Sequence, residues 1–173
     1  MESPTTISIS PIKSEDIPDV ANIYMLTCLL DNAMKFNYPT PQQFVQATID
    51  TLEIRFEDPA WRAIKAVDTA TTTISAWACW VTVLPGEKRA RNEEGGFNAF
   101  LQGEIDGMLE KWTGGEKYIS CKACFTLPEF QGRGMGKAMI KYGNEVADKE
   151  GLPIYLLASP AVRIVFLKPW VKY

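Results

Sequence analysis

The sequence FQGRGMGKAM, residues 130–139, places a glycine at every second position, at 132, 134 and 136. It follows KYISCKACFTL, which alternates like a strand, and it leads into a segment with the apolar spacing of a helix. The first N–H groups of a helix have no partner within the helix, and with the helix dipole they form an anion site. Glycines there let a phosphate oxygen approach the backbone without meeting a Cβ atom. The stretch is therefore interpreted as a cradle for a phosphate or a pyrophosphate.

Three phosphate-binding patterns can be compared with this stretch. The dinucleotide fingerprint GxGxxG fits Gly132 and Gly134 but then meets Lys137. The Walker loop GxxxxGK[ST] needs one more residue between Gly132 and Gly136, and a hydroxyl residue after the lysine. The pattern Q/R-x-x-G-x-G/A is matched fully by Gln131, Gly134 and Gly136. The alternative is a glycine-rich turn that serves only tight packing.

Working outward from this loop, the rest of the chain alternates between strand and helix patterns. A Thr-Pro pair at 40–41 is a typical helix start. The segment 86–115 is a charged, glycine-rich insertion that ends in a helical pattern. The order predicts a mixed α/β fold with one sheet. Strands are predicted at 7–12, 60–68, 73–85, 117–127 and 153–159, and helices at 14–34, 40–58, 97–112 and 133–150.

The composition is that of one globular domain spanning residues 1–173. Apolar residues make up 46% and charged residues 23%, the net charge is −3 and the pI is about 5.1. An acidic chain of this kind argues against a nucleic-acid partner, which calls for a basic face. No secretion signal and no apolar run near the ~20 residues of a membrane helix is found. We expect a cytoplasmic protein without a membrane or nucleic-acid partner; the sequence leaves its oligomeric state open, a dimer included.

The cysteines do not form a metal-binding pattern. Cys121 and Cys124 make a CxxC, but Cys28 and Cys79 lie far from them in the sequence and the chain has no histidine. Positions three apart in a strand face opposite sides of the sheet. We therefore expect separate buried or half-buried thiols, no metal, and a reducing compartment.

The loop in its context resembles the GCN5-related N-acetyltransferase (GNAT) family. LPEFQGRGMGKAMIKYG looks like that family's strand-loop-helix segment, SAWACWVTVLP is similar to the strand before it, and GLPIYLLASPA resembles the strand and turn after it. The matching order runs from about residue 7 to residue 161. The resemblance implies a single mixed, mostly antiparallel sheet flanked by helices. It also implies transfer of an acetyl group from acetyl-CoA to a small-molecule primary amine.

The resemblance further implies how coenzyme A would bind. The backbone of the strand end would pair with the pantetheine arm, and loop N–H groups would hold the pyrophosphate. Arg133 or Lys137 would add positive charge, although either side chain can equally be a solvated one. The N–H of Leu127 or of a neighbour would stabilise the oxyanion. The implied cofactor-binding residues are Phe125, Thr126, Leu127, Gln131, Gly132, Arg133, Gly134, Met135, Gly136 and Lys137.

The catalytic acid and base are less well marked. In the family a tyrosine after the last turn commonly protonates the thiolate, and the ungapped alignment places Phe166 there. The expected Gly-Phe pair and final strand are also missing, so we expect a truncated or atypical C-terminal end. Candidate bases acting through water are Glu104, Asp106, Glu110 and Glu116, although a solvated surface position is the simpler interpretation of each one.

Three hypotheses follow from these patterns. The first is an acetyl-CoA-dependent N-acetyltransferase, and the second is a catalytically weak or inactive CoA-binding protein of the same fold. The third is an interaction module whose glycine turn binds nothing. Trp77 and Trp80 face opposite sides of their strand, so at most one lines an acceptor pocket, and core packing is the simpler interpretation of both.

Overall fold

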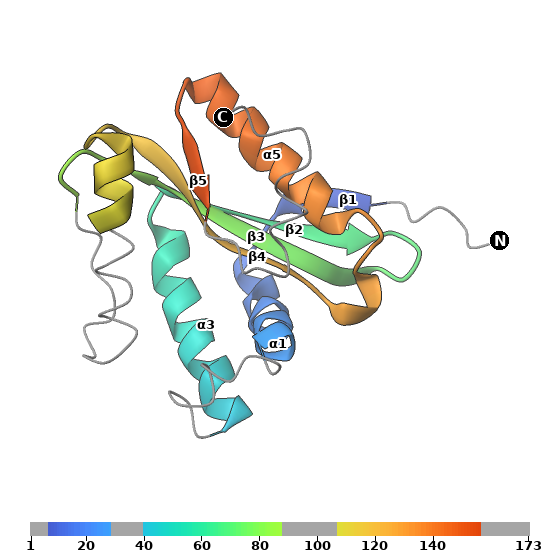
Figure 1. The fold of residues 1–173 in the computed structure, drawn as a ribbon. Helices are drawn as coiled ribbons and strands as arrows, with labels where there is room; N and C mark the ends of the chain where they lie inside the picture. The colour runs from blue at the N-terminus through green and yellow to red at the C-terminus, as the bar shows by residue number, and fades with distance from the viewer. Residues whose placement is uncertain (1–6, 29–39, 88–106, 157–173) are drawn as a thin grey trace.

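A computed structural model describes residues 7–28, 40–87 and 107–156 of the chain. Its centre is a five-stranded sheet with helices on both faces (Figure 1). The strands lie in the order β1-β2-β3-β4-β5, and only the β4–β5 pair is parallel. The predicted α/β fold with a mixed, mostly antiparallel sheet is confirmed, whereas the predicted atypical C-terminal end lies outside the described residues. The strands are β1 (Ile7–Pro11), β2 (Trp61–Asp68), β3 (Thr73–Val83), β4 (Tyr118–Thr126) and β5 (Ile154–Leu156).

The helices cover the two faces unequally. The short 3-10 helix η1 (Ser14–Asp16), α1 (Ile17–Cys28) and α3 (Pro41–Glu57) lie on one face, and α5 (Met135–Glu150) covers the other (Figure 1). The predicted start of α3 is present, because Thr40 Oγ1 accepts a hydrogen bond from the Gln43 N–H at 3.2 Å. Residues 107–113 are helical and are the described part of the helix predicted before β4. In the ranges that the structure describes, no helix is long and apolar enough to cross a membrane.

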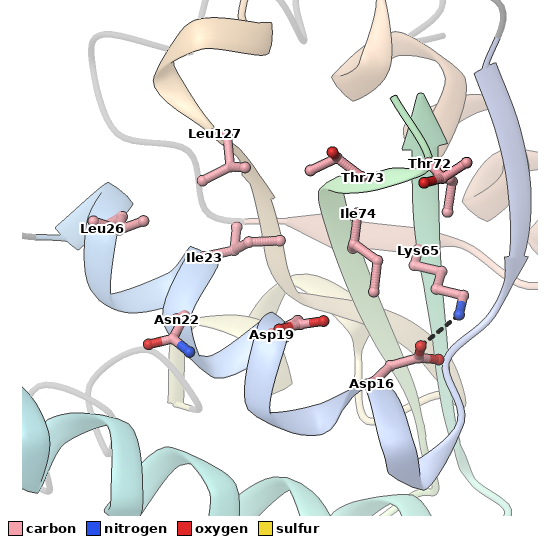
Figure 2. A pocket seen from close by; sticks show the side chains of 11 residues that line it. Asp16, Asp19, Asn22, Ile23, Leu26, Lys65, Thr72, Thr73, Ile74 and Leu127 are labelled. Atoms are coloured by element: carbon pink, nitrogen blue, oxygen red, sulfur yellow. Dashed lines mark hydrogen bonds and ion pairs between the residues drawn. The ribbon is translucent and has the colours of Figure 1, made fainter. Parts of the chain in front are cut away.

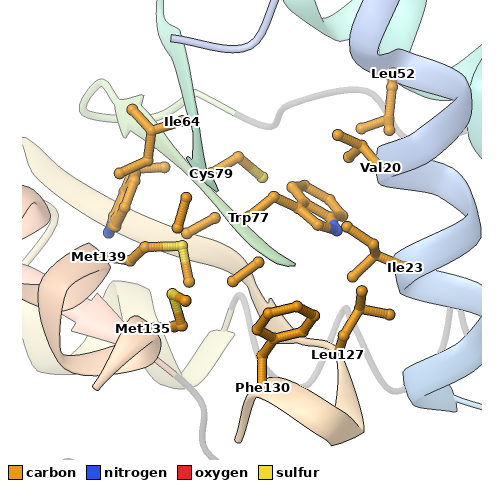
Figure 3. Packing of buried hydrophobic residues seen from close by; sticks show 14 of the residues in the cluster. Val20, Ile23, Leu52, Ile64, Trp77, Cys79, Leu127, Phe130, Met135 and Met139 are labelled. Carbon is orange, nitrogen blue, oxygen red and sulfur yellow. The ribbon is translucent and has the colours of Figure 1, made fainter. Parts of the chain in front are cut away.

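The core is continuous through the sheet and is built around two tryptophans of β3. Trp77 is 1% exposed and lies toward Val20, Ile23 and Leu52, as Figure 3 shows. Trp80 is 2% exposed and its ring centroid lies 5.9 Å from that of Tyr142 in α5. The two rings therefore lie on opposite faces, as predicted, and both belong to the core.

A glycine in the middle of α5 lets this helix dock on the sheet. A Cβ atom at Gly143 would lie 2.6 Å from Cε2 and Nε1 of Trp80. Real Cβ atoms do not approach a ring so closely, and the indole is held by the core on its other sides. Gly143 is thus required by packing, and it fixes how close α5 lies to β3.

A β-bulge in β4 changes which side chains share a face. Cys79 pairs with Ala123 but Trp80 pairs with Cys121, so Lys122 is an extra residue in β4. Cys124 pairs with Ala78, and Cys121 pairs with Trp80. Ala78 and Trp80 are two positions apart in β3, so their side chains lie on the same face of the sheet. Because cross-strand partners share a face, Cys121 and Cys124 lie on that face as well. The expectation that the two thiols of CKAC face opposite sides is therefore wrong, because strict alternation fails at the bulge.

Candidate active site

One edge of β4 is open where the strand approaches the glycine loop. β5 pairs with β4 only at Ile119–Cys121, so no described strand lies along the β5 side beyond Cys121. On the other side β4 stays paired with β3 up to Thr126. An edge of this kind presents backbone N–H and C=O groups to which an extended ligand can add as a further strand.

The hydrogen-bond register decides which backbone groups face that edge. The Leu127 N–H donates to the Ser75 carbonyl at 2.9 Å, so the backbone of Leu127 points toward β3. Backbone groups alternate sides along a strand, so Phe125 also points toward β3, whereas Cys124 and Thr126 face the open edge. This conflicts with the prediction of Leu127 as the oxyanion donor, because its N–H is already used within the sheet.

Gln131 makes two hydrogen bonds that the sequence does not indicate, and one of them connects the loop to the open edge of β4. Its backbone N–H donates to the Pro128 carbonyl at 3.2 Å, in the 3-10 helix η2 (Pro128–Phe130). Its side-chain Nε2 donates to the Thr126 carbonyl, also at 3.2 Å. The predicted use of the Gln131 N–H for a pyrophosphate is therefore not supported, and its side chain instead orders the last carbonyl of the open edge.

The glycine loop has the conformation of an anion cradle. Gly132 and Gly134 have φ of 78° and 88°, which side-chain-bearing residues rarely adopt. The helix starts at Met135, and the Ala138 N–H in its first turn donates to the Gly134 carbonyl at 3.0 Å. In the described part of the chain, no acceptor lies against the N–H of Gly132, Gly134 or Gly136. These donors surround the exposed start of a helix of 16 residues.

Packing within the protein does not explain these three glycines. A Cβ atom built at Gly132, Gly134 or Gly136 meets no atom within 4 Å, in contrast to Gly143 on the same helix. This argues against the alternative of a turn that is glycine-rich only for tight packing. The space over the loop is open to a ligand, and a phosphate oxygen with several lone pairs suits its N–H groups.

The other loop residues anchor or flank the cradle. Met135 is 1% exposed, and its Sδ lies 3.4 Å from Ser75 Oγ, so its side chain fixes the helix start to β3 while its backbone stays in the loop. The Arg133 guanidinium lies 5.3 Å from the centre of the Phe130 ring, beside the glycines. Lys137 is exposed in the first turn of α5. The Arg133 guanidinium is therefore close to the loop, and Lys137 follows Gly136 directly in the sequence.

The thiols of Cys79, Cys121 and Cys124 are not reactive groups. Burial raises the pKa of Cys79 to about 12 and that of Cys124 to about 11. Burial, and secondarily the neighbouring Cys124, raise the pKa of Cys121 well above its usual value. All three stay protonated near neutrality, and a thiol in that form is neither a nucleophile nor a good metal ligand. Among the described residues, no group of three or more potential metal-ligating side chains is found.

Several predicted catalytic residues fall elsewhere. Phe166, Glu104 and Asp106 lie outside the described residues. Glu110 and Glu116 are exposed and precede β4, at the end of the strand opposite to the glycine loop. The described structure therefore brings together the residues predicted to bind the cofactor, but it does not bring Glu110 and Glu116 to them.

A separate pocket of about 630 Å³ lies along α1, between that helix and the β2–β3 hairpin (Figure 2). Lys65 Nζ donates to Asp16 Oδ1 at 2.5 Å at one end, and Leu127 lies at the other. Burial alone would raise the pKa of Asp16, but hydrogen bonds from Lys65 and from the Lys13 N–H outweigh burial and lower it. Sequence analysis missed this pocket, since Asp16 and Lys65 are 49 residues apart.

Comparison with known proteins gives a consistent result. The sequence model of the acetyltransferase (GNAT) family matches residues 57–163, and none of the curated proteins matches the chain. The fold is similar to the crystal structure of a predicted acetyltransferase with acetyl-CoA from Clostridium acetobutylicum (13% identity, TM-score 0.63, 97% of this chain and 96% of that chain). It is also similar to a GCN5-related N-acetyltransferase from Ralstonia eutropha (12%, 0.63, 97% and 94%) and to glucosamine-6-phosphate N-acetyltransferase from Arabidopsis thaliana (15%, 0.58, 97% and 92%).

Proposed function

Because this chain belongs to the GNAT family of acetyltransferases, we propose that it transfers the acetyl group of acetyl-CoA to the nitrogen of a small primary amine. The observation that carries this proposal is the continuity of the open edge of β4 with the glycine loop and the start of α5. An extended arm that ends in a pyrophosphate needs two adjacent features: a strand edge with which the arm can pair, and next to it a site for the pyrophosphate anion. The described chain supplies them within Cys124–Gly136.

Different residues would bind different parts of coenzyme A. The backbones of Cys124 and Thr126 would pair with the amides of the pantetheine arm. The N–H groups of Gly132, Gly134 and Gly136 would hold the pyrophosphate, with Arg133 beside it. For the oxyanion we assign, in place of the Leu127 N–H, whichever of the Thr126 and Cys124 N–H groups the pantetheine arm leaves unpaired, because both face the open edge.

The reaction itself makes few demands on side chains. The amine nitrogen attacks the carbonyl carbon, an N–C bond forms, and the C–S bond breaks with loss of the CoA thiolate. The proton that leaves the nitrogen is balanced by one that the thiolate takes up. A thiol of pKa near 8.5 is a good leaving group, so the backbone N–H that stabilises the oxyanion and the positioning of the thioester account for most of the catalysis.

A second candidate is a CoA-binding protein of low activity, which one sequence observation favours. Phe166 stands where the family pattern has a tyrosine that protonates the thiolate, and it has no hydroxyl to donate. Such a protein would bind CoA through the same loop but would turn over slowly.

One experiment separates the two candidates. The purified protein is titrated with CoA by calorimetry, and release of free CoA thiol from acetyl-CoA is then followed across a panel of primary amines and one tertiary amine. Binding with release that depends on a primary amine supports the transferase. Binding without release from any amine favours the second candidate, and absence of CoA binding at millimolar concentration refutes both.

A further inference from the structure

Four aromatic rings form a block on the α1–α3 face of the sheet, next to the open edge of β4. They come from four elements, and this block comprises Tyr24 of α1, Phe44 of α3, Trp77 of β3 and Phe125 of β4. The Tyr24 and Phe125 rings are stacked, with centroids 4.5 Å apart and an interplanar angle of 29°. The Trp77 ring lies 5.6 Å from Phe125, and the Phe44 ring lies 5.0 Å from Tyr24.

Two rings of the block are buried and the other two are partly exposed. Trp77 is 1% exposed and Phe44 is 6% exposed, so neither ring has room to move. Tyr24 and Phe125 are partly exposed and form the side of the block that faces outward.

Phe125 lies between the two residues whose backbones face the open edge. Side chains alternate between faces along a strand, and the pairing with Trp77 and the stacking on Tyr24 place Phe125 on the α1–α3 face. An arm paired with Cys124 and Thr126 would therefore run beside the Phe125 ring. Farther along the strand the open edge ends at Cys121, where β5 begins to pair with β4. The other face of the sheet is covered by α5.

We propose that the Tyr24–Phe125 stack limits the length of the acyl group that the protein accepts, and so restricts its donors to short acyl thioesters of CoA. This inference rests on the proposed function. The end of the open edge and the stack would then bound the space left for the acyl group, so a long chain would have to displace two rings that pack against Phe44 and Trp77. Well-packed interiors resist such displacement.

Binding of CoA thioethers tests the limit without any turnover. CoA derivatives that carry an ethyl, butyl or hexyl group on sulfur are titrated by calorimetry into the wild type, Phe125→Ala and Tyr142→Ala. We expect the wild type to bind hexyl-CoA at least tenfold more weakly than ethyl-CoA. Phe125→Ala should bind hexyl-CoA at least tenfold more tightly than the wild type does, since each methylene that enters an apolar space adds about fourfold to affinity.

Tyr142→Ala is the matched control, because it removes a partly buried ring that packs on Trp80 from the opposite face. It should keep the wild-type preference for the ethyl group. If Phe125→Ala does not fold, as judged by circular dichroism, Tyr24→Ala removes the other ring of the stack and should open the same space.

The possible failures are distinguishable. A wild type that binds ethyl-CoA and hexyl-CoA equally well overturns the acyl limit and leaves the proposed function standing. The same holds if the folded stack variants retain the wild-type preference. If CoA and all three thioethers fail to bind the wild type, the proposed function is refuted and the acyl limit with it.

Discussion

Gly143 and Gly136 lie on the same helix, and the same substitution should have opposite effects at the two positions. In Gly143→Ala the new Cβ would lie 2.6 Å from the Trp80 indole, which is 2% exposed and confined by the core. Forcing such an atom into a packed core costs ~1–3 kcal/mol. The gain in helix propensity on replacing glycine by alanine is about 1 kcal/mol and offsets part of that cost. The net expectation is a loss of roughly 0–2 kcal/mol in the free energy of unfolding.

In Gly136→Ala the new Cβ meets no atom within 4 Å, and φ at this position is not positive. Only the propensity gain remains, so this variant should be more stable than the wild type by up to about 1 kcal/mol. Urea unfolding followed by circular dichroism measures both changes, and thermal melting should move the midpoint by ~2–4 °C per kcal/mol in opposite directions. A Gly143→Ala protein that gains as much stability as Gly136→Ala would refute the docking of α5 described above.

Three further results are expected. Lys65→Met leaves the Asp16 carboxylate without its hydrogen-bonded partner and should destabilise the fold by ~1–3 kcal/mol at neutral pH. Because the Asp16 pKa is lowered in the folded protein, this difference should shrink as pH falls below about 3.8, and a pH-independent difference would contradict it. Cys79 and Cys124 have pKa values of about 12 and 11, so site-resolved alkylation at pH 7 should be far slower in the folded than in the urea-unfolded protein, and equal rates would contradict their burial. Phe166→Tyr should raise the rate of thiol release without changing CoA affinity, by up to ~100-fold if a general acid is what the wild type lacks; an unchanged rate would show that the alignment there is misplaced.

The sequence predicts the fold and the place of the glycine loop between strand and helix, because both depend on local patterns. One continuous segment contains all the patterns that predict the loop. The alternation before Pro128 indicates a strand, the glycines at 132 and 134 allow a positive φ, and the spacing after them indicates a helix. The Thr40–Pro41 helix start is local in the same way, and it too is present in the structure.

The predictions that were wrong or missing concern features that depend on contacts between segments far apart in the sequence. Which backbone groups of β4 face the open edge depends on the register with β3, and the bond from Leu127 to Ser75 fixes that register. The bulge at Lys122 reverses the expected placement of the CKAC thiols, and nothing in the sequence of β4 alone indicates it. The role of Gly143 likewise becomes visible only with Trp80 against it.

The central claim, that the loop at the start of α5 holds the pyrophosphate of CoA, is tested most directly by one pair of charged variants. Gly134→Asp places a carboxylate in the cradle at a position of φ 88°. Gly151→Asp makes the same change at the other end of α5, where φ is 65° and a Cβ atom also meets nothing within 4 Å. Both variants place a side chain at a positive φ and add the same charge, so they differ mainly in the end of α5 at which the carboxylate lies.

The measurement is calorimetric titration of CoA into the wild type and these two variants. We predict that Gly134→Asp binds CoA at least tenfold more weakly than the wild type, whereas Gly151→Asp binds it as the wild type does. Equal affinities of Gly134→Asp and the wild type, or an equal loss in both variants, would contradict the assignment of the cradle.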